Sequence, residues 1–442
     1  MAKIIPFRGI RYNPVLVRDL AGVFAPPHDV VSESSRERLL ARHPHNIGRL
    51  LLGQTGEAEN DRYPRIAAEF NAWLNNQILV RDPTPSIYLY DQEYHLDGEE
   101  PLVRQGIIAL CRIEDFSTGL VKPHEATRSH LTADWFHLIE ACHANLSPVF
   151  ALYSDPCCVL EVFGKKEKYR SPDLDIRDDE GVKHRLWRSS ESSLIEKVQS
   201  VLDSKPLLIA KGHHCYEAAL GFRDFMRSGR TNFTGKEAFN YVLICFANME
   251  DPGMRVFPTH RVINGLIDFK MTDFLRKLAN YFHIDSRSYA VETMASRREI
   301  RQTLAELGKD RHALGLYTGG ELMHYLVLKE EQVMDDLFDA STPRVLRTLD
   351  VSILHRLILE KILDFGIEER AGQVRYVEGF DDSFRLVMEE NAQLAFLMNP
   401  TPLGEVREVA NSGEIMPFKS TSFYPNCPSG LVFYNIDDED LL

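Results

Sequence analysis

One short segment constrains the fold of this chain more than any other. Residues 207–210 form an apolar run typical of a buried strand, and Gly212 follows after a single lysine. Apolar residues then recur at helical spacing over residues 216–226. Glycine accepts backbone conformations that other residues avoid, so it suits an abrupt turn. The segment therefore predicts a strand, a glycine turn and a helix in direct succession.

The predicted turn carries groups that suit a phosphate or another oxyanion. The first N–H groups of a helix lie at its positive end without helical partners, and Lys211 adds a charge beside them. His213 and His214 titrate near neutrality, so they can donate to an anion or move a proton. The spacing matches neither a P-loop nor a Rossmann fingerprint. On spacing alone, histidines that only cap the helix remain an equal alternative.

The rest of the chain alternates strand and helix patterns, without an internal repeat or a low-complexity linker. We expect strands near residues 86–90, 106–110, 148–153, 241–248, 254–257, 312–317, 322–328, 373–377 and 394–398, with a hairpin at 169–187. We expect helices near residues 63–76, 131–142, 271–282, 292–307, 350–364, 381–390 and 403–411. The pattern indicates an α+β (mixed α/β) chain of two lobes, residues 1–265 and 266–442.

Composition limits the compartment and the partners. The 442 residues carry a net charge of −14, which opposes a broad nucleic-acid or anionic-membrane surface. Four acidic residues lie in the tail at 437–440. The seven cysteines form no CxxC pair, and the apolar run at 241–247 is too short to cross a bilayer. Because the start shows no signal-peptide pattern, we expect a cytoplasmic protein that binds neither a membrane nor nucleic acid broadly.

A second candidate site follows Pro123. Glu125 could activate a substrate hydroxyl or bind magnesium, with His124 and Arg128 beside it. The plain alternative is a salt bridge between Glu125 and Arg128 within a loop. His28-Asp29, after two prolines, is a turn that could also carry site chemistry, although such turns are more often structural.

Two later segments also suit anions. His260 and Arg261 follow an expected strand, where such a pair can hold a phosphate or a carboxylate; a weak surface ion pair is the alternative. A turn closed by Pro425 offers an ammonium, hydroxyls and N–H groups: Lys419, Ser420, Thr421 and Tyr424. We expect this turn to face Gly212 across a cleft between the lobes, with Glu125, His213, His260 and Lys419 converging there.

Many short motifs of this chain occur in the order found in one protein family. Residues 211–217 resemble the family's D-G-H-H-R-Y-E signature, residues 26–32 resemble its P-P-Y-D-V-I-S opening, and residues 123–127 match its P-H-E-x-T loop. Further matches lie at 45–49, 145–148, 248–252, 258–261, 399–402 and 419–425. The chain is identified as a member of the domain of unknown function 1015 family, over nearly its whole length.

A wider resemblance concerns the glycine corner. It is similar to the nucleotide-binding box of ParB-type partition proteins, sulfiredoxin and archaeal free-serine kinases. Gly212 and His213 resemble the D-G-H-T-R box of the kinases most. Two positions depart from it: Lys211 replaces an acid, and Cys215 replaces an arginine that would grip phosphate through paired hydrogen bonds. We expect Cys215→Arg with Lys211→Asp to strengthen nucleotide binding, unless the pocket has filled in around the thiol.

The resemblance implies a small-molecule, serine-kinase-like phosphotransferase that uses Mg²⁺ and ATP or ADP. Glu125 would be the base, with His213 and His214 as catalytic phosphate ligands. The remaining expected nucleotide or phosphate ligands are Lys211, Gly212, Arg128, His124, His260, Arg261, Lys419, Ser420, Thr421 and Tyr424. Of these, Lys211, Arg128 and His260 would neutralise charge. The two departures favour an alternative, a non-catalytic nucleotide or metabolite sensor. DNA binding in the manner of ParB is opposed by the acidic charge.

Overall fold

The computed structural model describes residues 3–27, 31, 33–52, 59–96, 100–229, 232, 234–365, 370–390 and 392–436. His28, Asp29 and the acidic tail at 437–440 lie outside these residues. The chain divides into two compact units. Unit 1 comprises Met1–Pro123, Thr127–Arg255 and Pro425–Leu442, and unit 2 comprises His124–Ala126 and Val256–Tyr424.

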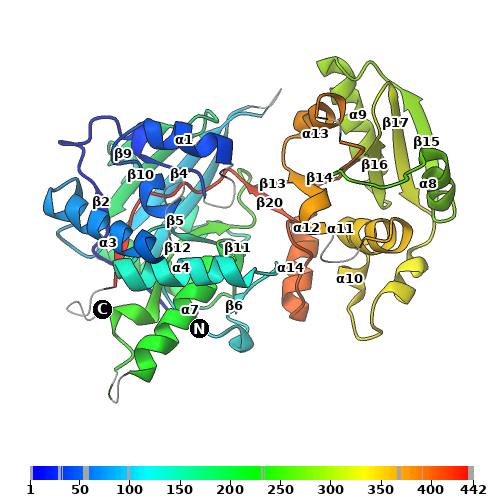
Figure 1. The fold of residues 1–442 in the computed structure, drawn as a ribbon. Coiled ribbons are helices and arrows are strands. Elements are labelled where there is room, and N and C mark those ends of the chain that lie inside the picture. Colours follow the sequence, from blue (N-terminus) through cyan, green and yellow to red (C-terminus); the bar gives the residue numbers. More distant parts are fainter. Residues whose placement is uncertain are drawn as a thin grey trace. The chain divides into compact units, whose positions relative to one another are not determined.

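Unit 1 is built on a mixed sheet, which contains nine strands in the described part of the chain (Figure 1). Eight of them lie in the order β6 (Val121–Lys122), β11 (Leu207–Lys211), β8 (Val149–Tyr153), β12 (Tyr241–Asn248), β5 (Leu102–Arg112), β4 (Ile87–Tyr94), β10 (Lys183–Ser189) and β9 (Leu174–Arg177). The short β1 (Ile4–Ile5) pairs with β5. Only β6–β11 and β8–β12 are parallel among these described pairs. The apolar β12 is buried along its whole length, as expected for a central strand.

Short strands and helices complete unit 1. Two strand pairs lie outside the main sheet: β2 (Ile10–Tyr12) with β3 (Leu79–Arg81), and β7 (Ala144–Asn145) with β21 (Tyr434–Asn435). The α-helices are α1 (Glu33–Ala41), α2 (Gly48–Leu51), α3 (Glu59–Asn75), α4 (Ser129–Cys142), α5 (Val159–Gly164), α6 (Ser192–Leu202) and α7 (His213–Ser228). Short 3-10 turns occur at Ala21–Val23, Phe116–Thr118, Glu167–Tyr169 and Ala238–Asn240. Helices α4 and α7 pack side by side (Figure 1).

Unit 2 contains a second sheet, which has six strands among the described residues. Its order is β15 (Phe282–Ser288), β17 (Leu322–Leu328), β16 (Ala313–Tyr317), β19 (Leu394–Leu397), β14 (His260–Ile263) and β18 (Val374–Val377). Strands β13 (Arg255–Phe257) and β20 (Ser422–Tyr424) form a separate pair.

Helices surround the unit 2 sheet. They are α8 (Met271–Leu278), α9 (Met294–Leu307), α10 (Arg344–Arg347), α11 (Asp350–Ser352), α12 (Arg370–Gln373), α13 (Phe380–Met388) and α14 (Leu403–Ser412), with a 3-10 segment at Glu331–Leu337 and a π-helix at Ile353–Ile362. Helix α9 packs on β16 and β17, and α13 packs on β14 and β19. Their apolar faces enclose a core that includes Tyr317, Tyr325 and Phe384. Thr293 caps α9 by accepting a hydrogen bond from the Ser296 N–H at 3.2 Å.

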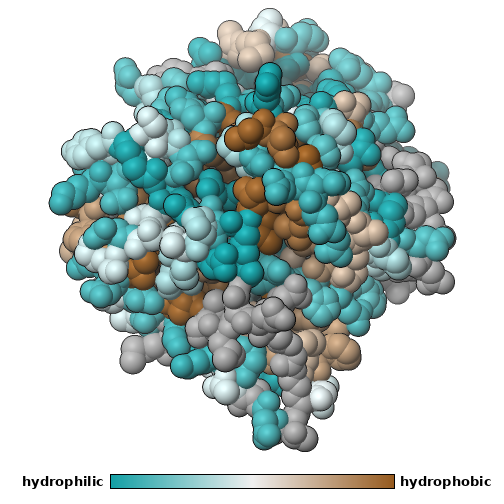
Figure 2. Space-filling view, turned by 90° about the vertical axis from the view of Figure 1, so that its left-hand side faces the viewer, coloured by the Kyte–Doolittle hydropathy of each residue, from teal (hydrophilic) through white to brown (hydrophobic). Residues whose placement is uncertain are grey.

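The structure confirms the expected mixed α+β fold and corrects two details. The helix expected at 271–282 ends at Leu278, because Phe282 begins β15. That edge strand is mostly exposed and polar beyond its first residues, so it lacked a strand signal. Most of the helix expected at 350–364 is a π-helix. No helix among the described residues is long and apolar enough to cross a membrane. The face in Figure 2 is largely hydrophilic, with small hydrophobic groups near its centre.

Candidate functional site

The glycine corner of unit 1 has the predicted local structure. Strand β11 ends at Lys211, Gly212 adopts the left-handed conformation with φ +85°, and α7 begins at His213. A Cβ atom at position 212 would lie 3.3 Å from the Val149 Cα. Both the positive φ and this close approach require glycine here. The expected strand–glycine–helix core is therefore confirmed, and the first N–H groups of a sixteen-residue helix lie at this corner.

Arg128 and His214 hold the start of α7. The Arg128 N–H donates to the His214 Nε2 at 2.8 Å, so this nitrogen is an acceptor and any proton of the neutral ring lies on Nδ1. Strand β6 runs parallel to β11, so both strands end at the same edge of the sheet. Arg128 thus contributes a backbone contact to the corner. His213 is buried at the first helical position, with 7% of its surface exposed.

The ammonium of Lys211 contacts a residue that the sequence analysis missed. Its Nζ donates to the Asn426 Oδ1, and the Asn426 carbonyl accepts from the Gln92 Nε2 at 2.7 Å. Asn426 therefore links β11 to β4 in unit 1. Its distance along the chain from Lys211 is 215 residues, and neither segment carries a local signal for the contact. A phosphate ligand would have to share Lys211 with this amide.

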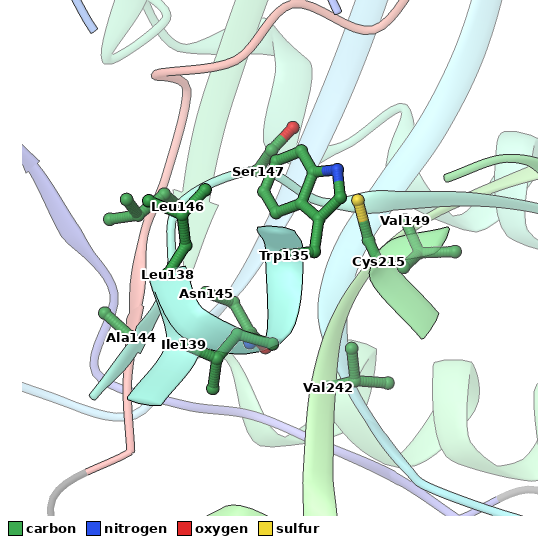
Figure 3. A pocket seen from close by; sticks show the side chains of 10 residues that line it. All are labelled: Trp135, Leu138, Ile139, Ala144, Asn145, Leu146, Ser147, Val149, Cys215 and Val242. Carbon is green, nitrogen blue, oxygen red and sulfur yellow. The ribbon is translucent and has the colours of Figure 1, made fainter. Parts of the chain in front are cut away.

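Cys215 lies in an apolar environment. Figure 3 shows its sulfur in a pocket with side chains from α4, β8 and β12. Trp135, Leu138, Val149 and Val242 are among the lining residues. A longer charged side chain at 215 would have to enter this apolar pocket or turn away from it. The apolar lining therefore opposes a charged side chain at position 215.

Unit 2 contains a cluster around Glu125, which we call the Glu125 cluster and define as His124, Glu125, Arg261, Lys419 and Thr421. The Glu125 Oε1 accepts from the Thr421 N–H at 3.1 Å and from the Thr421 hydroxyl at 3.0 Å. The His124 Nε2 lies 2.8 Å from the same hydroxyl and 3.6 Å from Oε1, and His124 is fully buried. The turn predicted to bind an anion therefore binds a carboxylate of the protein itself.

Arg261 supports that turn from within unit 2. Its Nη2 donates to the Lys419 carbonyl at 2.9 Å, and its Nη1 donates to the Thr259 carbonyl. The guanidinium is fully buried against the Tyr376 ring, and its Nε has no hydrogen-bond partner among the described atoms. Burial lowers the pKa of Arg261 to about 10, and the charges of Tyr376 and Glu125 partly oppose this shift. Arg261 is thus a buried cation that stabilises the turn by donating to the Lys419 carbonyl.

His260 is a neutral residue. Its Nδ1 accepts from the Met398 N–H at 3.0 Å, and burial, aided by the charges of Arg261 and Arg301, lowers its pKa to about 3. An imidazole with this pKa carries no charge at neutral pH, which corrects the expectation that His260 neutralises a phosphate. Successive residues of a strand point to opposite faces, so His260 and Arg261 cannot grip one anion together from β14.

The other residues of the predicted turn have mainly structural contacts. Ser420 is buried, its hydroxyl donates to the Pro417 carbonyl, and its own carbonyl accepts from the Thr401 hydroxyl at 3.0 Å. The Tyr424 ring packs 4.9 Å from the Phe257 ring. Within the described ranges, no three His, Cys, Asp or Glu side chains come together as a metal site. The convergence of the corner with Glu125, His260 and Lys419 on one cleft stays a prediction.

These observations define a mixed α+β protein with a helix-start corner in one unit and a carboxylate held by a turn in the other. Its sequence places it more narrowly. Residues 4–352 match the model of the family described as "Protein of unknown function (DUF1015)". The chain belongs to this family, as the motif order indicated. No curated protein matches the chain.

Several solved structures are weakly similar to this chain. A free serine kinase in complex with AMP has a TM-score of 0.35 and 11% identity, over 73% of this chain and 91% of that chain. A conserved hypothetical protein from Pyrococcus furiosus has a TM-score of 0.34 and 12% identity, over 73% of this chain and 94% of that chain. C-terminally truncated SbnI from Staphylococcus aureus has a TM-score of 0.34 and 10% identity, over 75% of this chain and 90% of that chain. Likenesses of this size carry no argument about activity.

Proposed function

We propose that this protein is a nucleotide-dependent phosphotransferase that acts on a hydroxyl group of a small molecule. The observation that carries the proposal is the Gly212 corner, where a buried strand meets the start of a sixteen-residue helix. The N–H groups of the first helical turn and the positive end of the helix dipole suit a phosphate of the nucleotide. The similarity of this box to that of free-serine kinases supports the choice of phosphoryl transfer.

The corner residues have distinct roles in this proposal. Gly212 lets the phosphate approach the backbone, Lys211 supplies a positive charge, and His213 lies in the first turn of α7. His214 and Arg128 fix the start of the helix through their mutual hydrogen bond. Phosphoryl transfer depends mainly on positioning and charge stabilisation, so a preformed corner of this kind is its main requirement.

Glu125 is the proposed general base. Thr421 donates two hydrogen bonds to one of its oxygens, which favours the ionised carboxylate that a base requires. Magnesium in such enzymes keeps several waters and binds through one or two carboxylates and the substrate phosphates. In the proposal, the nucleotide phosphates bind Mg²⁺. Glu125 is the candidate protein carboxylate, because it lies three residues before the corner residue Arg128 in the sequence.

Thermal unfolding with ATP, ADP, CTP or pyrophosphate, each with Mg²⁺, tests nucleotide binding. A ligand at a hundredfold excess over Kd should stabilise the protein by about 2.7 kcal/mol. Gly212→Ala should abolish this shift, because a Cβ there meets Val149 and the residue must keep φ +85°. Gly181→Ala is the matched control: Gly181 has φ +82° but open space around it. A shift that survives Gly212→Ala would contradict the proposed phosphate site.

Phosphate transfer itself is tested with Glu125→Gln. This variant should still bind Mg-nucleotide but lose about two to four orders of magnitude in transfer to a panel of small hydroxyl compounds, serine included. Equal transfer rates in the variant and the natural protein would remove Glu125 from the base role.

The alternative is a non-catalytic nucleotide or metabolite sensor. Two observations favour it. Cys215, in an apolar pocket, stands at the position where the similar kinase box has a phosphate-binding arginine, and Lys211 already donates to Asn426. A protein that shifts with nucleotide but transfers no phosphate to any hydroxyl compound would favour the sensor over the kinase.

A further inference from the structure

Thr421 contacts the Glu125 carboxylate with both of its polar donors. The backbone N–H lies 3.1 Å from Oε1, and the hydroxyl oxygen lies 3.0 Å from the same atom. The two residues are 296 positions apart in the chain, so only the fold of unit 2 brings them together. Two donors on one oxygen fix both the position and the rotation of the carboxylate more firmly than one would.

The same hydroxyl connects Glu125 to His124. A threonine hydroxyl has one proton, and Thr421 donates it to Oε1. At the 2.8 Å contact with His124, the hydroxyl oxygen must therefore accept, and the proton lies on the His124 Nε2. The buried imidazole packs edge-on against the Phe423 ring, with 5.7 Å between ring centroids. His124 thus orients the hydroxyl, and the hydroxyl orients the carboxylate.

The turn that carries Thr421 is held on both sides. Arg261 donates to the Lys419 carbonyl at 2.9 Å, and Thr401 donates to the Ser420 carbonyl at 3.0 Å. Lys419 itself has φ +59°, an uncommon conformation for a residue with a side chain. Charged or titratable groups that act on Glu125 within unit 2 include His124 and Arg261. The turn therefore holds the N–H and the hydroxyl of Thr421 in a fixed position.

We propose that Thr421 is the positioning residue of Glu125 and does not bind the nucleotide phosphate. It orients the carboxylate and stabilises its ionised form through two donated hydrogen bonds, while His124 sets the direction of the hydroxyl. This inference rests on the proposed function in one respect, namely that Glu125 is the base. It replaces the role of phosphate ligand that the sequence pattern favours for Thr421.

Thr421→Val and Thr421→Ser test the inference in the full-length protein. Valine removes the hydroxyl at similar volume, and serine keeps it. Thr421→Val should lower kcat for hydroxyl transfer by about tenfold to a hundredfold, with the nucleotide KM unchanged. The acid limb of its pH–rate profile should move to higher pH, since a lost hydrogen bond disfavours the carboxylate. Thr421→Ser should restore both. A raised nucleotide KM with unchanged kcat would instead make Thr421 a phosphate ligand and overturn the inference.

A readout without activity separates this inference from the proposed function. In protein labelled with ¹³C at glutamate carboxyls, the signal lost in Glu125→Gln identifies Glu125. Its protonation midpoint should rise by about one pH unit in Thr421→Val and stay unchanged in Thr421→Ser. Thr348→Val, which removes a hydroxyl bonded to the Arg344 carbonyl, controls for the substitution itself. If the natural protein transfers no phosphate, the proposed function fails but this titration still decides. An unchanged midpoint in Thr421→Val overturns the positioning role.

Discussion

The Gly212 corner of unit 1 and the Glu125 cluster of unit 2 arrange polar groups for an oxyanion in different ways. At the corner, the candidate donors are backbone N–H groups of consecutive residues at the start of α7, directly after one glycine with φ +85°. In the cluster, Thr421 from a remote turn donates two hydrogen bonds to the carboxylate, and a buried arginine donates to the Lys419 carbonyl of the same turn. The corner therefore depends on backbone geometry, whereas the cluster depends on side chains.

This difference predicts which substitutions matter. At the corner, the start of α7 depends first on Gly212, with one further hydrogen bond from the Arg128 N–H to the His214 ring. In the cluster, His124, Arg261 and Thr421 are buried, and each makes a hydrogen bond within the cluster, so truncating one of them leaves unsatisfied groups behind.

Arg261→Ala should be the most damaging of these changes. It leaves the Lys419 and Thr259 carbonyls without their donor and opens a cavity beside Tyr376. We expect a loss of about 3 kcal/mol in the free energy of unfolding, measured with urea. Arg276→Ala is the control, because Arg276 pairs with Asp273 on the surface and should change stability by less than about 0.5 kcal/mol. Equal effects of the two would show that the cluster does not depend on its buried arginine.

Cys215→Arg should have an intermediate effect at the corner. The thiol lies among Trp135, Leu138 and Val149, so a guanidinium there either overpacks an apolar pocket or loses its hydration (Figure 3). We expect a destabilisation of about 2 kcal/mol and no tighter nucleotide binding. Cys157→Arg is the control, since Cys157 is exposed. Tighter Mg-nucleotide binding in Cys215→Arg, measured by titration calorimetry, would restore the expectation that arginine completes the phosphate site.

The sequence predicts the corner because all of its signals are local. The apolar run, the glycine and the helical spacing follow one another within twenty residues, and β11, Gly212 and α7 match them. The sequence likewise predicts strands β8, β12, β16, β17 and β19, because each is a largely buried apolar run. Strand β14 escaped prediction because it opens with His260 and Arg261, two residues that are seldom buried.

The Glu125 cluster was only half predictable. Its members could be named from their residue types and motifs, yet their partners could not. The contacts of Thr421 with Glu125 and of Arg261 with Lys419 span 296 and 158 residues, and a single sequence contains no signal for such pairings. The same holds for Asn426 and Lys211 in unit 1. In the structure Thr421 donates to the Glu125 carboxylate, and the phosphate-binding role expected for the turn stays a prediction.

The contrast between the units extends to pH. In unit 1, burial alone would raise the pKa of Glu237, but hydrogen bonds from Thr234 and Gly235 outweigh it and lower the pKa to about 2. The folded-state pKa lies below the ordinary value of 4.5, so the carboxylate stabilises the fold above that pH. This stabilisation, on the order of 1 kcal/mol, is lost as the pH falls from 4.5 towards 2. Glu237→Gln should flatten this part of the stability–pH curve, and an unchanged acid limb would contradict the assignment.

In unit 2, His312 should produce the opposite and smallest effect. Its hydrogen bond to Asp350, at 2.9 Å from Nδ1, is the main cause that raises the pKa of His312, against the effect of burial. A raised folded-state pKa means that the pair stabilises the fold fully below pH 6.5. That stabilisation disappears as the pH rises through the folded-state value. Because His312 is partly exposed, we expect only about 0.5 kcal/mol.

Urea unfolding of His312→Gln between pH 5.5 and pH 8.5, taken as roughly one unit below and two above the ordinary histidine value, measures this effect. The variant should be less stable than the natural protein at the acid end and equal to it at the alkaline end. His137→Gln is the matched control, because His137 contacts Glu140 from an exposed position on α4 and should change little at either pH. A His312 variant that loses more stability at alkaline pH would reverse the sign and leave the two units alike in their response to acid.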